Sequence, residues 1–335
     1  MVVSLRGTLG LSDIVTDLTA HYDYFVYQDG IDGYVHSGIY NSAKLISKSS
    51  IRQAVTDALN SHPSYKLVLT GHSLGGGCAA LLSMLWSKRV VSDDGTIGTL
   101  PHFNTLINNF VEFVTNTSFG FPLRPIHCFV FACPAIMSGD LSKSFKDLVT
   151  TFIYRHDVVP CLSLGMVRDF RNITVSFCHE EGLAESVIAK VLGIFREESG
   201  YGMGGGGRGS TSPLQAESKE RDELWYWALL KTLRADMKAE KLHPPGRVYW
   251  INGQQSGFVT DQEPASSTTP TESEDDESLD GEKDKKKRQE TTPLSIWEVD
   301  DVEIAFSEIV FSTSMFTDHS PHHYEGSLSL LSKLV

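Results

Sequence analysis

One stretch decides the fold of this chain: Tyr65-Lys66-Leu67-Val68-Leu69-Thr70-Gly71-His72-Ser73-Leu74-Gly75-Gly76-Gly77-Cys78-Ala79-Ala80. It opens with an apolar run of strand length, passes through Gly71-x-Ser73-x-Gly75, and continues with small residues and leucines that are typical of a helix through about Trp86. Strand, sharp turn and helix in this order form the nucleophile-elbow pattern. The stretch therefore predicts a reactive serine at the end of a buried strand.

The glycines and the serine of this pattern each have a physical reason. The turn brings the strand and helix backbones close together, so that a Cβ at Gly71 or Gly75 would collide. Ser73 is expected in a strained conformation that exposes its hydroxyl group. The helix N-terminus supplies the Leu74 N–H and a partial positive charge to a developing oxyanion. The alternative interpretation is a glycine-rich turn with an idle serine.

Composition narrows the class of protein. With 335 residues the chain can bury one large α/β core, and a net charge of −13 argues against a nucleic-acid partner. The sequence contains no apolar run of about 18 residues and no signal peptide. The odd number of cysteines, mostly in apolar runs, predicts reduced core residues in a reducing compartment: Cys78, Cys128, Cys133, Cys161 and Cys178.

Strands and helices alternate along the chain, which predicts a mostly parallel sheet flanked by helices. The expected strands are residues 2–5, 67–69, 126–132, 148–154 and 247–251, with further structure at 294–299 and 302–311. The expected helices are residues 13–22, one long helix from Ser37 or Asn41 to Asn60, residues 105–114, 184–195 and 212–233, and a short helix at the end. Because a core strand begins at residue 2, we expect that N-terminal strands are missing.

Residues 1–253 and 294–335 are expected to form one domain together. Within it, residues 199–212 predict a flexible glycine-rich loop. Residues 254–293 form a low-complexity insertion with an acidic run and a basic run, too poor in apolar residues to order itself.

A reactive serine needs a base, and the base needs an orienting carboxylate. In α/β-hydrolases the carboxylate and then the histidine follow the serine along the chain. Asp157 lies just past the expected strand at 148–154, where α/β sheets place functional groups, and His319 follows the last expected strand. Ser73, Asp157 and His319 therefore fit the order of a catalytic triad.

Each of these residues has alternatives. Asp157 fits equally a turn before Pro160, and His319 competes with His322 and His323. The other two histidines near motifs are expected to be structural, with His72 packed beside the serine and His36 in hydrogen bonds.

The oxyanion needs two N–H donors. Leu74 supplies one, and Thr8, which follows the strand at residues 2–5, is the candidate for the other. Asp13, a few residues further on, is explained by a helix cap.

Motifs at both ends of the chain resemble those of a known family. They are Val2-Val3-Ser4-Leu5-Arg6-Gly7-Thr8, Asp13, Thr16-Asp17-Leu18, Val35-His36-Ser37-Gly38, Gly71-His72-Ser73-Leu74-Gly75-Gly76, Pro244-Pro245-Gly246-Arg247 and Met315-x-x-Asp318-His319-x-Pro321. Together they resemble the class 3 lipases, and most closely their sn-1-specific diacylglycerol lipase branch.

The resemblance implies an α/β-hydrolase fold with Ser73 as nucleophile, Asp157 as orienting carboxylate and His319 as base. It also implies that Thr8 helps to form the oxyanion hole and that Asp13 supports that loop. The implied reaction cleaves the sn-1 acyl ester of diacylglycerol to a fatty acid and 2-monoacylglycerol.

The resemblance implies a lipid partner at a membrane or lipid-droplet surface. The expected location is the cytoplasmic side of a membrane, peripheral for the chain as given and integral if the natural chain carries the N-terminal helices of its relatives. The triad requires no cofactor, and Ca²⁺ is a candidate by resemblance alone. Residues 254–293 are rich in Ser and Thr beside acids, which makes them a candidate for kinase regulation, although an idle linker is the simpler interpretation.

Two other functions fit the same residues. A phospholipase A1 or general lipid esterase would use the same triad with a different pocket. A catalytically inactive lipase-like module would only bind lipid. For any of them we expect the acyl chain to lie near Leu9, Leu11 and residues 96–122.

Overall fold

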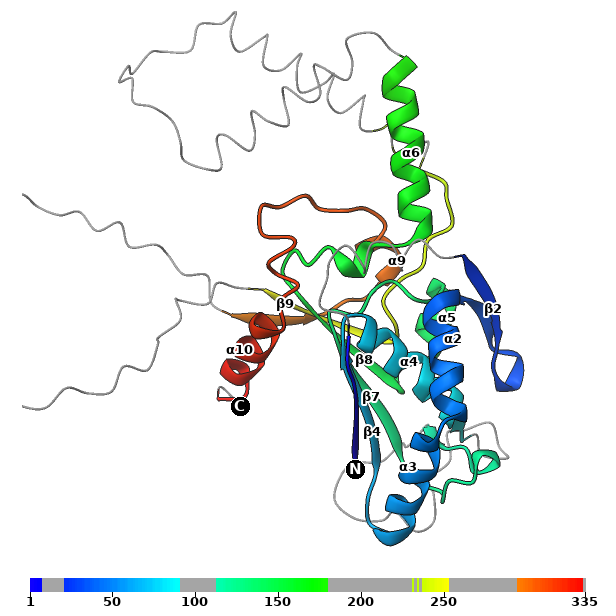
Figure 1. Ribbon diagram of the computed structural model, residues 1–335. Coiled ribbons are helices and arrows are strands. Elements are labelled where there is room, and N and C mark those ends of the chain that lie inside the picture. Colours follow the sequence, from blue (N-terminus) through cyan, green and yellow to red (C-terminus); the bar gives the residue numbers. More distant parts are fainter. Residues whose placement is uncertain are drawn as a thin grey trace, which may run out of the picture.

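The central sheet has the strand order β1-β4-β7-β8-β9-β10. Its strands are Val2–Leu5 (β1), Leu67–His72 (β4), Ile126–Phe131 (β7), Val149–Tyr154 (β8), Arg247–Asn252 (β9) and Ser295–Glu298 (β10). The first five are parallel, and β10 is antiparallel to β9. The carboxyl ends of the parallel strands therefore meet at one edge of the sheet, which is the upper edge in Figure 1.

This computed structural model describes residues 1–7, 21–90, 113–179, 231, 234, 237–252 and 294–333. Several sequence predictions lie outside the described residues: the helix at 13–22 up to residue 20, the helix at 184–195, most of the helix at 212–233, the glycine-rich loop 199–212 and the insertion 254–293. The expected end of the first of these helices at Tyr22 is wrong, because Tyr22 begins a strand, Tyr22–Val26. The division into domains stays a prediction, although β10, which follows the insertion, pairs with β9, which precedes it.

Helices lie on both faces of the sheet. Ser37–Lys48 (α2), Ser50–Ser61 (α3) and Leu74–Trp86 (α4) lie on one side, and Pro321–Leu331 (α10) lies on the other (Figure 1). α4 packs on β1, β4 and β7, α2 packs on α4, and α10 contacts β8. A mostly parallel sheet flanked by helices, as in an α/β-hydrolase, is thus confirmed.

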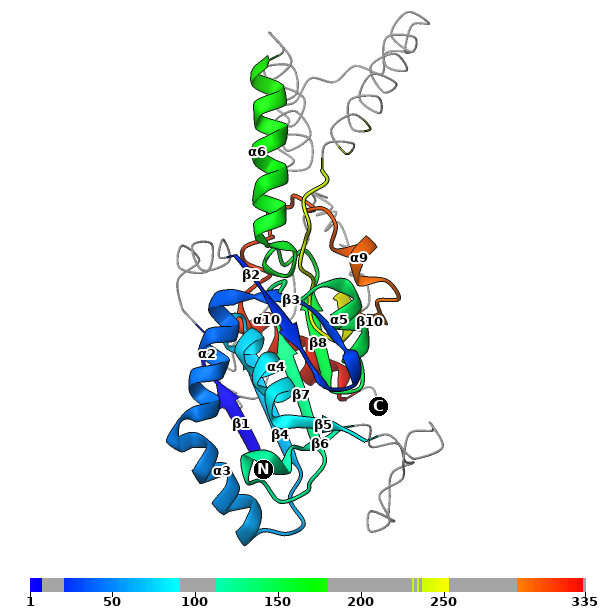
Figure 2. The same ribbon diagram turned by 90° about the vertical axis from the view of Figure 1, so that its right-hand side faces the viewer.

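The remaining elements border this sheet. A hairpin of Tyr22–Val26 (β2) and Asp32–His36 (β3), and a short one of Ser87–Arg89 (β5) and Phe113–Thr115 (β6), lie outside it. The short helices are Gln28–Gly30 (η1), Thr117–Phe119 (η2), Gly139–Ser144 (α5), Val159–Cys161 (η3) and Val302–Ala305 (α9). Leu164–His179 (α6) projects away from the carboxyl edge of the sheet (Figures 1 and 2).

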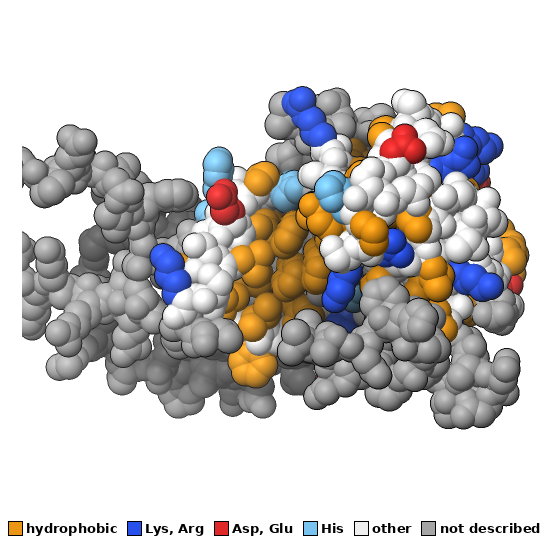
Figure 3. All heavy atoms as spheres, turned by 90° about the horizontal axis from the view of Figure 1, so that it is seen from below, with side chains coloured by type: hydrophobic (Ala, Val, Ile, Leu, Met, Phe, Trp, Pro, Cys, Tyr) orange, Lys and Arg blue, Asp and Glu red, His pale blue; other side chains and the backbone are white. Residues whose placement is uncertain are grey.

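The core is organised around α4. Nearly every residue of this helix is buried, and its glycines and alanines allow close packing on the sheet. Leu81 and Leu82 are fully buried, and each such side chain stabilises the fold by about 2 kcal/mol. On the sheet face that α4 leaves uncovered, the Phe131 and Phe152 rings stack at 5.5 Å, and Figure 3 shows hydrophobic side chains gathered in a hollow of the surface.

The prediction of a single long helix from Ser37 or Asn41 to Asn60 is wrong, because the helix is interrupted at Ser49. The Ser49 backbone is extended, with φ −81° and ψ 174°. Its hydroxyl donates to the carbonyl oxygen of Ile46 (2.7 Å) and accepts from the Ile51 N–H (3.3 Å). Serine competes with the helix for its own hydrogen bonds, so Ser49 ends α2 and caps α3.

Two further differences concern helices. The helix expected over residues 105–114 is wrong at its end, since Phe113 and Val114 are buried in β6, which pairs with β5; residues 105–112 lie outside the described part. The sequence reading also missed α6, which begins at Leu164. The first turn of α6 is held by tertiary contacts, in which the Gly165 N–H donates to the Tyr22 hydroxyl (2.8 Å).

The turn between β4 and α4 leaves no room for side chains at its two glycines. A Cβ on Gly71 would meet the Gly75 carbonyl group, and a Cβ on Gly75 would meet the Leu5 carbonyl oxygen and the backbone of Arg6. The obstructing atoms are backbone atoms of the sheet and helix, which cannot move aside as a side chain can. The two glycines therefore set how closely α4 approaches β1 and β4.

We expect the substitution Gly75→Ala to lower the free energy of unfolding by about 3 kcal/mol, because the added methyl group forces the helix away from the sheet. Gly120→Ala is the matched control: Gly120 has φ +87° but open space around it, so backbone strain alone should cost about 1 kcal/mol. Urea denaturation of both variants measures the difference. Equal losses would show that close approach is not what requires glycine at the elbow.

Candidate active site

Ser73 occupies the elbow between β4 and α4. Its backbone has φ 56° and ψ −131°, a conformation that costs a non-glycine residue energy and is found mainly at functional sites. The surrounding backbone holds it there, since the Ser73 N–H donates to the Phe131 carbonyl oxygen (2.9 Å) and its own carbonyl oxygen accepts from the Gly77 N–H (3.0 Å). The expected strain at this serine is therefore present and aims the hydroxyl out of the turn. The expected exposure of the hydroxyl is wrong, because Ser73 is only 1% exposed and His319 lies against its oxygen.

The structure brings together the three residues that the sequence order singled out. Ser73 Oγ lies 2.9 Å from His319 Nε2. His319 Nδ1 lies 3.0 Å from both carboxylate oxygens of Asp157. Asp157 follows β8 and His319 precedes α10, so both reach Ser73 from the carboxyl edge of the sheet. All three side chains are buried, and each is hydrogen-bonded to the next.

Asp157 has two further hydrogen-bond donors. The Val159 N–H donates to Oδ1 (3.0 Å), and the Tyr324 hydroxyl donates to Oδ2 (2.5 Å). Because a buried carboxylate is stable only when its oxygens are hydrogen-bonded, these donors satisfy both oxygens of Asp157 beside the imidazole. The sequence analysis did not identify Tyr324. The only feature of the sequence that could have pointed to it is its place five residues after His319.

The segment that carries His319 is tied to the loop that carries Asp157. Asp318, also buried, accepts at Oδ2 from the His156 N–H (3.2 Å) and from the Ser314 hydroxyl (2.8 Å). A second link runs from the Val158 N–H to the Met315 carbonyl oxygen (3.3 Å). Asp318, which precedes His319, thus binds the backbone of His156, which precedes Asp157. This hydrogen bond fixes the two loops relative to each other.

His72, beside the serine, holds His319 through its backbone. Its Nε2–H donates to the His319 carbonyl oxygen (3.0 Å), and the two rings are 4.9 Å apart. Burial and the neighbouring His319 lower the pKa of His72 to about 4. The ring is therefore neutral at physiological pH and packs beside the serine, as expected from the sequence.

The competing histidines do not reach the serine. His322 is exposed on α10, and the His323 ring stacks on Tyr154 at 5.2 Å. His36 Nδ1 accepts from the Ile39 N–H (3.2 Å) and so caps α2. Of these residues, His319 alone contacts Ser73.

One of the two expected oxyanion donors can be placed. Leu74 is the first residue of α4, and the N–H groups of a helix's first turn have no partner within the helix. Thr8 and Asp13 lie outside the described residues. The last described residue before them, Gly7, lies against the elbow, since a Cβ built on it would meet the His72 carbonyl oxygen.

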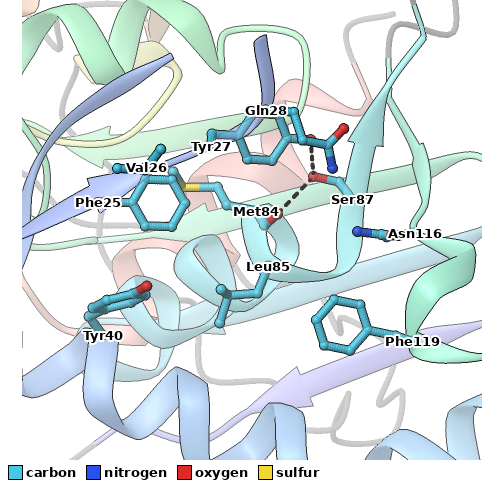
Figure 4. A pocket seen from close by; sticks show the side chains of 10 residues that line it. All are labelled: Phe25, Val26, Tyr27, Gln28, Tyr40, Met84, Leu85, Ser87, Asn116 and Phe119. Carbon is cyan, nitrogen blue, oxygen red and sulfur yellow. Dashed lines mark hydrogen bonds between the residues drawn. The ribbon is translucent and has the colours of Figure 1, made fainter. Parts of the chain in front are cut away.

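A pocket of about 380 Å³ lies at the other end of α4 (Figure 4). It is lined by Phe25, Val26, Tyr27, Gln28, Tyr40, Met84, Leu85, Ser87, Asn116 and Phe119. Met84 is eleven positions beyond Ser73, which corresponds to about 16 Å of helix. Of the acyl channel expected near Leu9, Leu11 and residues 96–122, only the part from 113 onward is described, and it contributes Asn116 and Phe119 to this distant pocket.

Within the described residues, no group of three or more His, Cys, Asp or Glu side chains is placed to hold a metal ion. Cys78, Cys128, Cys133 and Cys161 are free thiols, and burial raises the pKa of Cys78 to about 11 and that of Cys161 to about 12. These cysteines are protonated core residues.

Residues 2–166 match the family described as Lipase (class 3). This part of the chain, just under half of its length, belongs to the class 3 lipase family. The matched residues include β1, the elbow and the Asp157 loop, and the name of the family agrees with the predicted class, a carboxylic-ester hydrolase of the lipase type.

Among curated proteins, diacylglycerol lipase-beta of Mus musculus is 29% identical over 177 residues, which cover 51% of this chain and 21% of that protein. Diacylglycerol lipase-alpha of Homo sapiens is 24% identical over 333 residues, which cover 96% of this chain and 25% of that protein. A lipase of Rhizopus oryzae is 33% identical over 79 residues, 24% of this chain and 19% of that protein. The chain thus spans a quarter or less of the length of these relatives.

Among solved structures, the triacylglyceride lipase of Rhizomucor miehei matches with a TM-score of 0.33 and 19% identity, over 48% of this chain and 50% of that one. A likeness this low adds no weight to the assignment of the fold, which depends on the sheet and the elbow described above. Within the described residues, every helix is too short or too polar to cross a bilayer.

We expect His72 to destabilise this lipase fold in mild acid. Its pKa is near 4 in the folded chain against an ordinary value of 6.5, so below pH 6.5 the unfolded chain takes up a proton that the folded chain refuses. The stabilisation from the neutral ring is complete above pH 6.5 and is lost as the pH falls toward 4.

The matched variant is His72→Gln, which keeps an N–H donor of similar reach but does not titrate. Urea denaturation between pH 4 and 7 should show that proton uptake on unfolding near pH 5 decreases by about one in this variant. His127 and His243, whose pKa values burial also lowers, contribute to the slope that remains. An unchanged slope would contradict the assignment to His72.

Proposed function

We propose that this chain is a serine hydrolase in which Ser73 is the nucleophile, His319 the base and Asp157 the orienting carboxylate. The observation that supports these roles best is the continuous hydrogen-bonded path from Ser73 Oγ through the His319 ring to Asp157. A strained serine at a helix N-terminus, hydrogen-bonded to an imidazole that a carboxylate orients, is the arrangement that acyl transfer requires.

In the proposed reaction, Ser73 Oγ attacks the ester carbonyl carbon while its proton passes to His319 Nε2. The oxyanion accepts hydrogen bonds from the Leu74 N–H and, by resemblance, from Thr8. His319 then donates the proton to the departing glycerol oxygen, which leaves an acyl-enzyme. Water, deprotonated by the same imidazole, releases the fatty acid and restores Ser73.

For the substrate we propose the sn-1 acyl ester of diacylglycerol, with 2-monoacylglycerol as the second product. The support is the similarity to proteins named diacylglycerol lipase-alpha and diacylglycerol lipase-beta. A phospholipase A1 or general lipid esterase is the second candidate, since headgroup preference depends on pocket shape. An inactive lipid-binding module is less well supported, because binding alone gives no reason to keep Ser73 strained and hydrogen-bonded to His319.

We further propose that the substrate is met at a lipid surface on the cytoplasmic side of a membrane. Val310, Phe311 and Phe316, on the segment that leads to His319, expose about half of their surface or more, and apolar side chains beside a site that cleaves lipids suit contact with a bilayer. Calcium dependence and kinase regulation of residues 254–293 remain proposals from the resemblance and from composition.

We expect Ser73→Ala to reduce ester hydrolysis by about a millionfold while the fold persists. Labelling by a fluorophosphonate probe should stop with it, because the probe needs the activated oxygen. The control is Ser83→Ala, which removes a buried hydroxyl of the same helix. That hydroxyl donates to the Ala80 carbonyl oxygen (2.7 Å) and is no member of the proposed triad. Full hydrolysis by the Ser73 variant would contradict the nucleophile assignment.

The substrate proposal is tested with diacylglycerol that carries different acyl chains at sn-1 and sn-2, presented in mixed micelles. We expect release of the sn-1 acid, with phosphatidylcholine cleaved at least about tenfold more slowly because its headgroup must be accommodated or excluded. Equal rates on both lipids would favour the general esterase. Normal probe labelling without hydrolysis of either lipid would point to another ester class.

A further inference from the structure

We infer that Tyr324 is a positioning residue for the proposed hydrolysis, which acts through Asp157 on the orientation and basicity of His319. The inference rests on the proposed function. Its basis is one contact: the Tyr324 hydroxyl, on a helix at the far end of the chain, is 2.5 Å from Asp157 Oδ2.

The direction of this hydrogen bond is determined by its surroundings. The Tyr324 oxygen also accepts from the Tyr154 backbone N–H (3.0 Å). Because that N–H can only donate, the single proton of the hydroxyl is left for Asp157. Burial and the negative charge of Asp157 raise the pKa of Tyr324 well above its ordinary value. Tyr324 therefore remains a donor at every pH at which the site would work.

The Tyr324 ring is held among residues of the site. It makes edge contacts with the rings of His72 (5.7 Å), Tyr154 (6.0 Å) and Phe131 (6.5 Å between centroids). These residues come from the elbow and from the carboxyl ends of β8 and β7, and Tyr324 is only 2% exposed. A ring so confined fixes its hydroxyl, and through it the plane of the Asp157 carboxylate.

The contact also moderates the charge of Asp157. The carboxylate accepts from the Val159 N–H at Oδ1 and from Tyr324 at Oδ2, and it shares the His319 proton between both oxygens. Without the hydroxyl, the carboxylate is held less firmly and its charge acts more strongly on the imidazole. A stronger negative charge beside the imidazole of His319 makes it harder for the ring to pass its proton on. A tyrosine that served only to anchor α10 would have neither effect.

The test is Tyr324→Phe, which removes the hydroxyl and keeps the ring. With p-nitrophenyl butyrate as substrate we expect kcat to fall about tenfold with KM within twofold, because only the steps that use His319 are affected. The acid limb of the kcat/KM profile should move up by about half a pH unit. Tyr249→Phe is the control, since Tyr249 stacks on Phe152 at 5.8 Å, on the sheet and outside the triad, and its variant should keep the wild-type acid limb.

Tyr324→Phe also leaves the Tyr154 N–H without its partner, so some loss of stability is expected under either interpretation, and all rates are taken where circular dichroism shows the variant folded. A second measurement is a double-mutant cycle with Asp157→Asn, read as the rate of fluorophosphonate labelling of Ser73. If Tyr324 acts through Asp157, removal of the hydroxyl should slow labelling about tenfold in the wild type and less than about twofold in the Asp157→Asn background.

The outcomes separate this inference from the function on which it rests. Unchanged kcat and an unchanged acid limb in Tyr324→Phe, or equal effects in both backgrounds of the cycle, would overturn the positioning role while the wild type stays active. A wild-type protein that neither hydrolyses esters nor labels at Ser73 would instead overturn the proposed function.

Discussion

The structure depends on one close approach of backbone to backbone. At Gly71 and Gly75 the first turn of α4 lies against β4 and β1 with no room for a Cβ. This packing places the buried α4 at the centre of the core and forces Ser73 into a conformation with positive φ. The energy of that strain is offset by the burial of α4, so a well-buried helix holds a strained residue at its N-terminus.

The second constraint is the burial of polar groups at the carboxyl edge of the sheet. Asp157, Asp318 and His319 are each less than a tenth exposed, and such groups are stable only with hydrogen-bond partners. Their hydrogen-bond partners lie on the neighbouring segments of the site. Asp318 binds the backbone beside Asp157, and His72 binds the backbone of His319. Satisfying these groups therefore fixes the distances from Ser73 to His319 and from His319 to Asp157.

Sequence reasoning worked where a pattern has a local physical cause. The elbow was predicted from two glycines and a serine, and the strands from apolar runs such as residues 126–132. It failed at Ser49, whose hydroxyl ends one helix and caps the next although serine also occurs within helices. It also failed where the outcome depended on a distant partner: the end of the 105–114 segment pairs with a strand that follows α4, and the start of α6 is held by Tyr22, about 140 positions earlier.

The sequence by itself determined the family, the elbow and the order of a serine, an aspartate and a histidine, because each is written in short motifs with local steric or chemical causes. It left His319, His322 and His323 as rivals and gave no reason to single out Tyr324. Only the tertiary structure decided those points. Which histidine faces Ser73, and which hydroxyl reaches Asp157, depends on how α10 packs against β8 across the sheet, and such a contact between distant segments has no signature within either segment alone.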